Sequence, residues 1–156
     1  MGKVKLLLFV ILATMLTVSV GFAAEKSFKA KLTGKAEVPS VTTKASGEVK
    51  FKLSSDGKEL SYMLDVKNIM NANAAHIHRG MKGKSGPPVA NLFTGPKKEN
   101  NFSGELSKGT ITANDLSGDL MGKSLDDLVQ LIKSGDIYVN VHTDAKPDGE
   151  IRGQVK

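Results

Sequence analysis

Two of the three histidines in this 156-residue chain stand one residue apart, in the stretch Ala75-His76-Ile77-His78. Successive side chains of a β-strand point to opposite faces, so both rings would leave a strand on the same side. Their Cα atoms would lie roughly 6.5 Å apart, which lets two imidazoles reach one metal ion at about 2 Å each. The spacing therefore permits chelation. It suits equally two solvated or hydrogen-bonded rings on the polar face of a strand.

The third histidine lies in residues 137–143, where isoleucine and valine alternate with Tyr138, Asn140 and His142. Such alternation puts the apolar side chains on the core face and the other three on the opposite face. A pairing of this segment with the first would bring all three histidines together, and an imidazole-rich site suits copper or zinc. We predict His76, His78 and His142 as metal ligands. Their affinity should fall as the pH drops through the region near ~6.5, because imidazole must be neutral to bind.

Four polar residues are candidates to support this site: Glu37, Asn140, Glu150 and Arg152. Residues 147–149, Pro-Asp-Gly, predict the turn of a terminal hairpin, after which polar and apolar residues alternate again. If the polar faces of both strands coincide, the last three residues form a patch beside the histidines, and Glu37 can orient a ring. The alternative is an ion-pair and amide network that only fixes strand register. No residue is assigned a catalytic role.

The rest of the chain must supply strands that position these residues. Alternation with a period of two dominates after residue 25 and predicts an all-β domain. One segment, residues 124–133, has helical spacing instead, with Ser124 and Asp127 placed as a capping box and Gly135 just beyond its end. We predict an antiparallel, Greek-key-like β-sandwich or small barrel of about eight strands with one short connecting helix. The strands are expected near residues 28–32, 49–53, 60–66, 74–78, 89–93, 104–112, 136–143 and 150–155.

Residues 1–23 have the pattern of a secretory signal peptide, with Lys3 and Lys5 before an apolar run and small residues at its end. The run is shorter than the ~20 residues that span a bilayer, which argues against an uncleaved anchor. We expect cleavage after Ala23 and export to the periplasm or the extracellular space, with membrane contact only before cleavage. Residues 24–156 are expected to form one domain. The chain has no cysteine, so burial alone or a bound ion must stabilise it.

The net charge of +6 falls to +4 once Lys3 and Lys5 are removed, since that segment contains no acid. The lysines are spread along the chain, and no basic stripe is interleaved with aromatic residues. We therefore expect no nucleic-acid partner.

Several short motifs together resemble the CHRD domain family, the domain first named from chordin: KAEVP at 35–39, ASG at 45–47, AHIH at 75–78, GPPV at 86–89, YVNVHT at 138–143 and PDGEIRGQ at 147–154. The resemblance covers nearly the whole chain after the signal and implies a compact, mostly β domain. It implies no settled biochemical activity. The family's motif falls on Glu37, His76, His78, Asn140, His142, Glu150 and Arg152.

Three functions remain open. The first is an exported binding module whose three histidines hold copper or zinc. The second is a structural or adhesive module at the cell envelope, without metal, that contacts an unknown protein or envelope partner. The third, a metal-dependent oxidoreductase or hydrolase, is the least favoured, because the ligand set lacks an evident substrate pocket or general base. The His76-Ile77-His78 motif is similar to one in copper/zinc superoxide dismutase, but no disulfide pair or second ligand set accompanies it.

Overall fold

The structure is a computed structural model that describes residues 26–156. The signal peptide predicted over residues 1–23 lies outside the described residues. No helix within residues 26–156 is long and apolar enough to cross a membrane.

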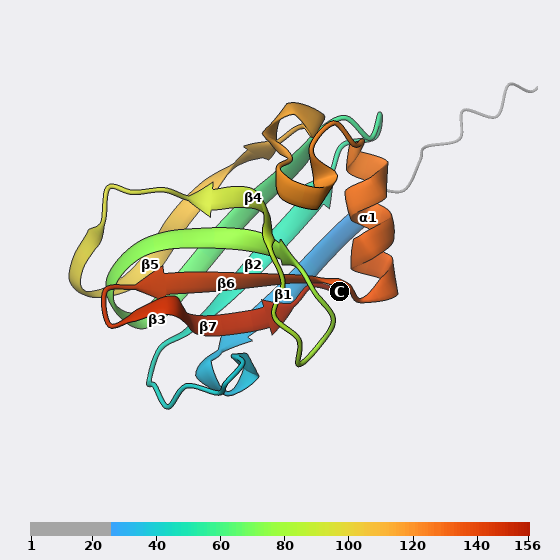
Figure 1. The fold of residues 1–156 in the computed structure, drawn as a ribbon. Helices are drawn as coiled ribbons and strands as arrows, with labels where there is room; N and C mark the ends of the chain where they lie inside the picture. Colours follow the sequence, from blue (N-terminus) through green and yellow to red (C-terminus); the bar gives the residue numbers. More distant parts are fainter. Residues whose placement is uncertain (1–25) are drawn as a thin grey trace, which may run out of the picture.

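Seven strands and one α-helix make up the described part of the chain, which confirms the predicted all-β class with its single helix (Figure 1). Three short 3₁₀ turns join them at Gly34–Ala36, Ala113–Asp115 and Gly118–Leu120. The main elements are β1 (Lys26–Thr33), β2 (Ser46–Leu53), β3 (Leu60–Arg79), β4 (Pro88–Phe93), β5 (Lys98–Ile111), α1 (Leu125–Ser134), β6 (Ile137–Thr143) and β7 (Lys146–Gln154).

The sheet closes into a five-stranded barrel, one of the two architectures predicted. Strands β2, β1, β7, β6 and β3 are hydrogen-bonded in that order, and β3 pairs again with β2. Strands β4 and β5 pair with the other side of β3 and extend the sheet beyond the barrel. All the pairings are antiparallel. Because β6 lies between β3 and β7, the three segments that carry all the predicted site residues except Glu37 become neighbours.

Strand β3 is twenty residues long and merges two predicted strands, 60–66 and 74–78, so there are seven strands rather than about eight. Between these segments Asn68 and Asn71 have φ of 53°, a left-handed conformation that asparagine tolerates better than most residues. The pairing of β3 with β5 shifts register at both places. These bulges interrupt the alternation that the sequence rule depends on, while the strand continues. Its first half pairs with β2 and its second half with β6.

Helix α1 begins and ends where the sequence predicts. The Ser124 Oγ accepts a hydrogen bond from the Asp127 N–H, and the Asp127 carboxylate accepts one from the Ser124 N–H, as expected of a capping box. Gly135 takes a φ of 81° and ends the helix. The buried face of the helix covers the core through Leu125, Leu128, Val129 and Ile132.

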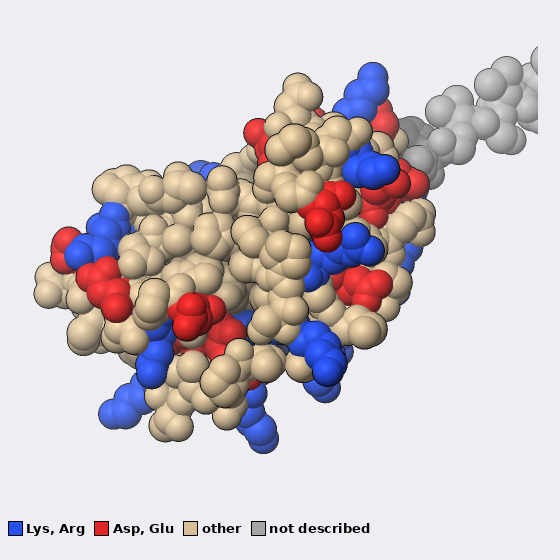
Figure 2. All heavy atoms as spheres, in the orientation of Figure 1, with Lys and Arg blue, Asp and Glu red and all other residues tan. Residues whose placement is uncertain are grey.

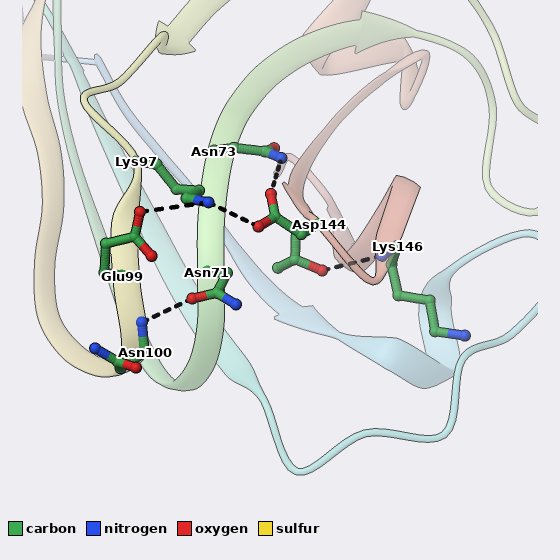
Figure 3. Close-up of polar contacts among 8 residues, drawn as sticks. Asn71, Asn73, Lys97, Glu99, Asn100, Asp144 and Lys146 are labelled. Carbon is green, nitrogen blue, oxygen red and sulfur yellow. Dashed lines mark hydrogen bonds and ion pairs between the residues drawn. The ribbon is translucent and has the colours of Figure 1, made fainter.

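The predicted turn at residues 147–149 is wrong. The chain reverses at Asp144 and Ala145, and residues 147–149 lie inside β7. Side chains from other elements hold the observed turn: the Asp144 carboxylate forms an ion pair with Lys97 at 2.9 Å and accepts a hydrogen bond from Asn73 at 3.0 Å (Figure 3). These partners are distant in sequence, so local turn composition did not reveal them.

Charges of both signs lie mainly around the margins of the face in Figure 2, where Lys and Arg lie close to Asp and Glu. Exposed ion pairs such as Lys50–Glu48 and Lys108–Glu105, each at 3.2 Å, are typical of a solvated surface and add little stability.

Candidate metal centre

The pairing of β3 with β6 brings the three histidines to one face of the sheet. His142 lies opposite Ala74, Asn140 opposite His76 and Tyr138 opposite His78. Directly opposite residues share a face, so all three rings leave the sheet on the same side. Their ring centroids are 4.8 Å apart for His76 and His142, 5.6 Å for His76 and His78, and 6.2 Å for His78 and His142. One nitrogen from each ring can be chosen so that all three lie within 4.8 Å of one another.

Backbone carbonyls orient two of the rings. His78 Nδ1 lies 2.9 Å from the Gly86 oxygen, and His142 Nδ1 lies 2.7 Å from the Pro147 oxygen. A carbonyl oxygen only accepts, so each Nδ1 carries the hydrogen and each Nε2 keeps its lone pair. Histidines that bind a metal through one ring nitrogen usually donate a hydrogen bond from the other in this way.

The Nε2 atom of His142 has a hydrogen-bond donor, whereas the Nε2 atom of His78 has none. His142 Nε2 accepts a hydrogen bond from His76 Nδ1 at 3.0 Å. His78 is 8% exposed, and its Nε2 is buried with no hydrogen-bond partner. An acceptor in this state lacks the donor or cation that its burial would normally require.

The cluster must contract to bind an ion. In a tetrahedral site two nitrogens at 2.0–2.1 Å from zinc lie about 3.4 Å apart, so histidine nitrogens that are up to 4.8 Å apart must approach by as much as about 1.4 Å. His76 must also move its hydrogen from Nδ1 to the other nitrogen, because Nδ1 now donates to His142.

Burial keeps all three rings neutral. It lowers the pKa of His78 and His142, and it lowers the pKa of His76 to about 4, helped by the repulsion that a charged His142 or His78 would add. Neutral imidazole is the form that binds metal. Protons therefore compete with an ion at a lower pH than the value near ~6.5 expected for free imidazole.

Arg152 is 2% exposed and holds the loop after β3 against the site. Its Nη2 donates to the carbonyl oxygens of Lys84 at 2.7 Å and Met81 at 3.3 Å. Its guanidinium carbon lies 3.4 Å from the centre of the Tyr138 ring, and Tyr138 stacks on His78 with centroids 4.8 Å apart. Arg152 therefore fixes Tyr138, which in turn restricts the His78 ring.

Glu37 is 8% exposed and lies near Asn140 and Arg152. Burial raises its pKa to about 7, although the Arg152 charge and the Val38 backbone N–H lower it. Its Oε1 has no hydrogen-bond partner. None of the hydrogen bonds described for Glu37 reaches a histidine, so its place is beside the Asn140 amide.

Glu150 makes a separate set of contacts. Its carboxylate accepts hydrogen bonds from the hydroxyls of Thr43 at 2.6 Å and Thr143 at 2.7 Å. The register of β6 and β7 shifts between Val141 and Thr143, which breaks the simple alternation that put Glu150 beside His142. Glu150 therefore links β7 to the segment before β2.

Sequence reasoning missed Tyr138 and the carbonyls of Gly86 and Pro147. The alternation of residues 137–143 does put Tyr138 on the same face as His142, so its contact with the site could have been predicted. The carbonyls belong to the backbone and have no residue type that a motif could reveal.

A family model for the CHRD domain matches residues 28–155. The chain belongs to the CHRD domain family. All seven residues of the predicted site fall within the matched range. Searches of curated proteins and of solved structures found no match to this chain.

Proposed function

We propose that this CHRD protein is an exported binding module that holds one copper or zinc ion through His76, His78 and His142. The observation that carries the proposal is the buried His78 Nε2, which has a lone pair and no partner. Leaving such an atom unsatisfied costs about 1–3 kcal/mol, and a bound cation would remove that cost. The close approach of the three rings also favours binding of one ion by all three.

A structural or adhesive module without metal is the competing function. It would account for the hydrogen bonds of His142 and for the stacking of Tyr138 on His78. It gives no reason for a buried ring nitrogen without a partner, which is why we favour the metal.

Metal analysis separates the two functions. Purified mature protein is loaded with Zn²⁺ or Cu²⁺, dialysed, and compared with His76→Ala, His78→Ala and the control Asn101→Ala, which alters an exposed residue of β5. We expect about one ion per chain in the wild type and in the control, and trace metal in both histidine variants. Equal trace amounts in all four proteins would contradict the proposal.

Thermal unfolding gives a second measure of binding. An ion that binds only the folded protein adds about 2.7 kcal/mol when its free concentration is 100 times Kd. The melting temperature of the wild type should therefore rise with added Zn²⁺, whereas that of His78→Ala should stay constant.

Export is the second half of the proposal and rests on the charged, apolar and small-residue pattern of residues 1–23. Expression of the full chain followed by cell fractionation and N-terminal sequencing tests it. We expect mature protein that begins at Ala24 outside the cytoplasm. Intact protein that keeps Met1 and stays in the cytoplasm would contradict export and leave the metal proposal unaffected.

A further inference from the structure

Asn140 lies on the same face of the sheet as the three histidines. It is opposite His76 in the adjoining strand, and it precedes His142 by two residues on its own strand, so the three side chains share a face. His78 lies one position diagonally away, because its own partner is Tyr138. Asn140 is 3% exposed, which is within the range of the apolar core residues.

A hydrogen bond fixes the orientation of the Asn140 amide. Its Nδ2 donates to the Asp148 carbonyl oxygen at 3.3 Å. Because that carbonyl can only accept, the amide nitrogen must face Asp148 and the Oδ1 must face away from it. The Oδ1 atom is buried and has no hydrogen-bond partner.

Two buried acceptors without partners therefore lie near each other, Asn140 Oδ1 and His78 Nε2. Asn140 is the diagonal neighbour of His78 across the β3–β6 pairing, so their side chains lie next to each other on one face. Two acceptors cannot satisfy each other, since neither has a hydrogen to give. A cation between them would serve both.

Glu37 lies on the nitrogen side of the Asn140 amide. A Cβ placed on Gly149 would lie 2.5 Å from Glu37 Oε1 and 2.6 Å from Asn140 Nδ2, so these two atoms flank the same point. A carboxyl oxygen there favours the orientation in which Nδ2 faces it and Oδ1 is turned away from it.

We propose that Asn140 Oδ1 is the fourth ligand of the ion and that the site therefore selects Zn²⁺ or Cu²⁺ over Cu⁺. This inference rests on the proposed metal function. Three imidazole nitrogens and one oxygen complete a tetrahedral zinc site, and oxygen donors suit divalent ions better than soft Cu⁺. A site with four protein ligands has no open position for substrate, so it holds the ion and does not catalyse a reaction.

Two substitutions of Asn140 test the assignment. Asn140→Leu keeps a similar branched shape, is somewhat larger and removes the oxygen, whereas Asn140→Asp keeps an oxygen and adds a charge; Asn101→Leu is the control. Zn²⁺ and Cu⁺ affinities are measured by competition with chelators, and Co²⁺ absorption reports the coordination. We expect Asn140→Leu to lower Zn²⁺ affinity at least about tenfold, to change the Co²⁺ spectrum and to alter Cu⁺ affinity by no more than about twofold. Asn140→Asp should bind Zn²⁺ more tightly than the wild type.

The outcomes separate this inference from the function on which it rests. If Asn140→Leu binds Zn²⁺ like the wild type with the same Co²⁺ spectrum, while His78→Ala loses the ion, Asn140 is not a ligand and a water molecule satisfies its oxygen. If the wild type binds Cu⁺ but no divalent ion, this inference is wrong and the proposed metal function stands. If it binds neither, both proposals are wrong. Should Asn140→Leu fail to fold, Asn140→Asp decides: tighter Zn²⁺ binding supports the assignment, and unchanged or weaker binding overturns it.

Discussion

Gly149 is the position where a single methyl group should disturb both the fold and the site. It lies in β7 with a φ of 126°, a backbone conformation that residues other than glycine rarely adopt. A Cβ there would lie 2.5 Å from Glu37 Oε1 and 2.6 Å from Asn140 Nδ2. Both side chains are buried, so they cannot swing into solvent to make room. We therefore expect Gly149→Ala to destabilise the protein and to displace Asn140.

The cost has two parts. Backbone strain at such a φ is worth about 1–3 kcal/mol. Moving the Asn140 amide also breaks its hydrogen bond to the Asp148 carbonyl, which is worth about 1 kcal/mol. The free energy of unfolding should thus fall by about 2–4 kcal/mol.

Gly83→Ala is the matched control, because Gly83 has a φ of 77° and a Cβ added to it would have no other atom within 4 Å. It should cost about 1–2 kcal/mol, from backbone strain alone. Urea unfolding of both variants, without metal, measures the difference, and Zn²⁺ titration should show weaker binding only for Gly149→Ala. Equal losses of stability in the two variants, with equal Zn²⁺ affinity, would refute the steric part of the reasoning.

Two further predictions concern the buried charges. Glu37 keeps its proton in the folded state up to about pH 7, whereas the unfolded chain releases it near the ordinary pKa of 4.5. Its contribution to stability is therefore present below pH 4.5 and lost as the pH rises through 7. Glu37→Gln should remove that loss. Its free energy of unfolding relative to the wild type should therefore rise by about 1–2 kcal/mol between about pH 5 and about pH 8, measured by urea unfolding without metal. A difference between the two proteins that does not change with pH would contradict this prediction. Arg152→Lys should cost about 1–3 kcal/mol, because lysine lacks the planar group that binds two carbonyls and stacks on Tyr138. It should also speed proteolysis in residues 80–87, and unchanged cleavage there would argue against the role of Arg152 as the anchor of that loop.

Local sequence patterns predicted most of the elements. Period-two alternation located strands such as β2, because each side chain alternately meets the core and water. The capping box of Ser124 and Asp127 and the glycine after the helix defined α1, because these contacts lie within a few residues of each other.

Features that depend on distant partners were predicted poorly. The bulges at Asn68 and Asn71 hide the continuity of β3, which only its pairing with β2, β5 and β6 reveals. The turn at Asp144 depends on Lys97 and Asn73. Glu150 is directed to two threonines by a register shift that alternation does not encode.

The sequence by itself determined that His76 and His78 share a face, because a strand has a fixed period of two. Only the tertiary structure decided that His142 joins them, since that depends on the register between β3 and β6, which brings together residues far apart in the chain. It also decided which atoms are buried without a partner, because burial depends on everything packed around a side chain. His78 Nε2 and Asn140 Oδ1 became candidate ligands for that reason.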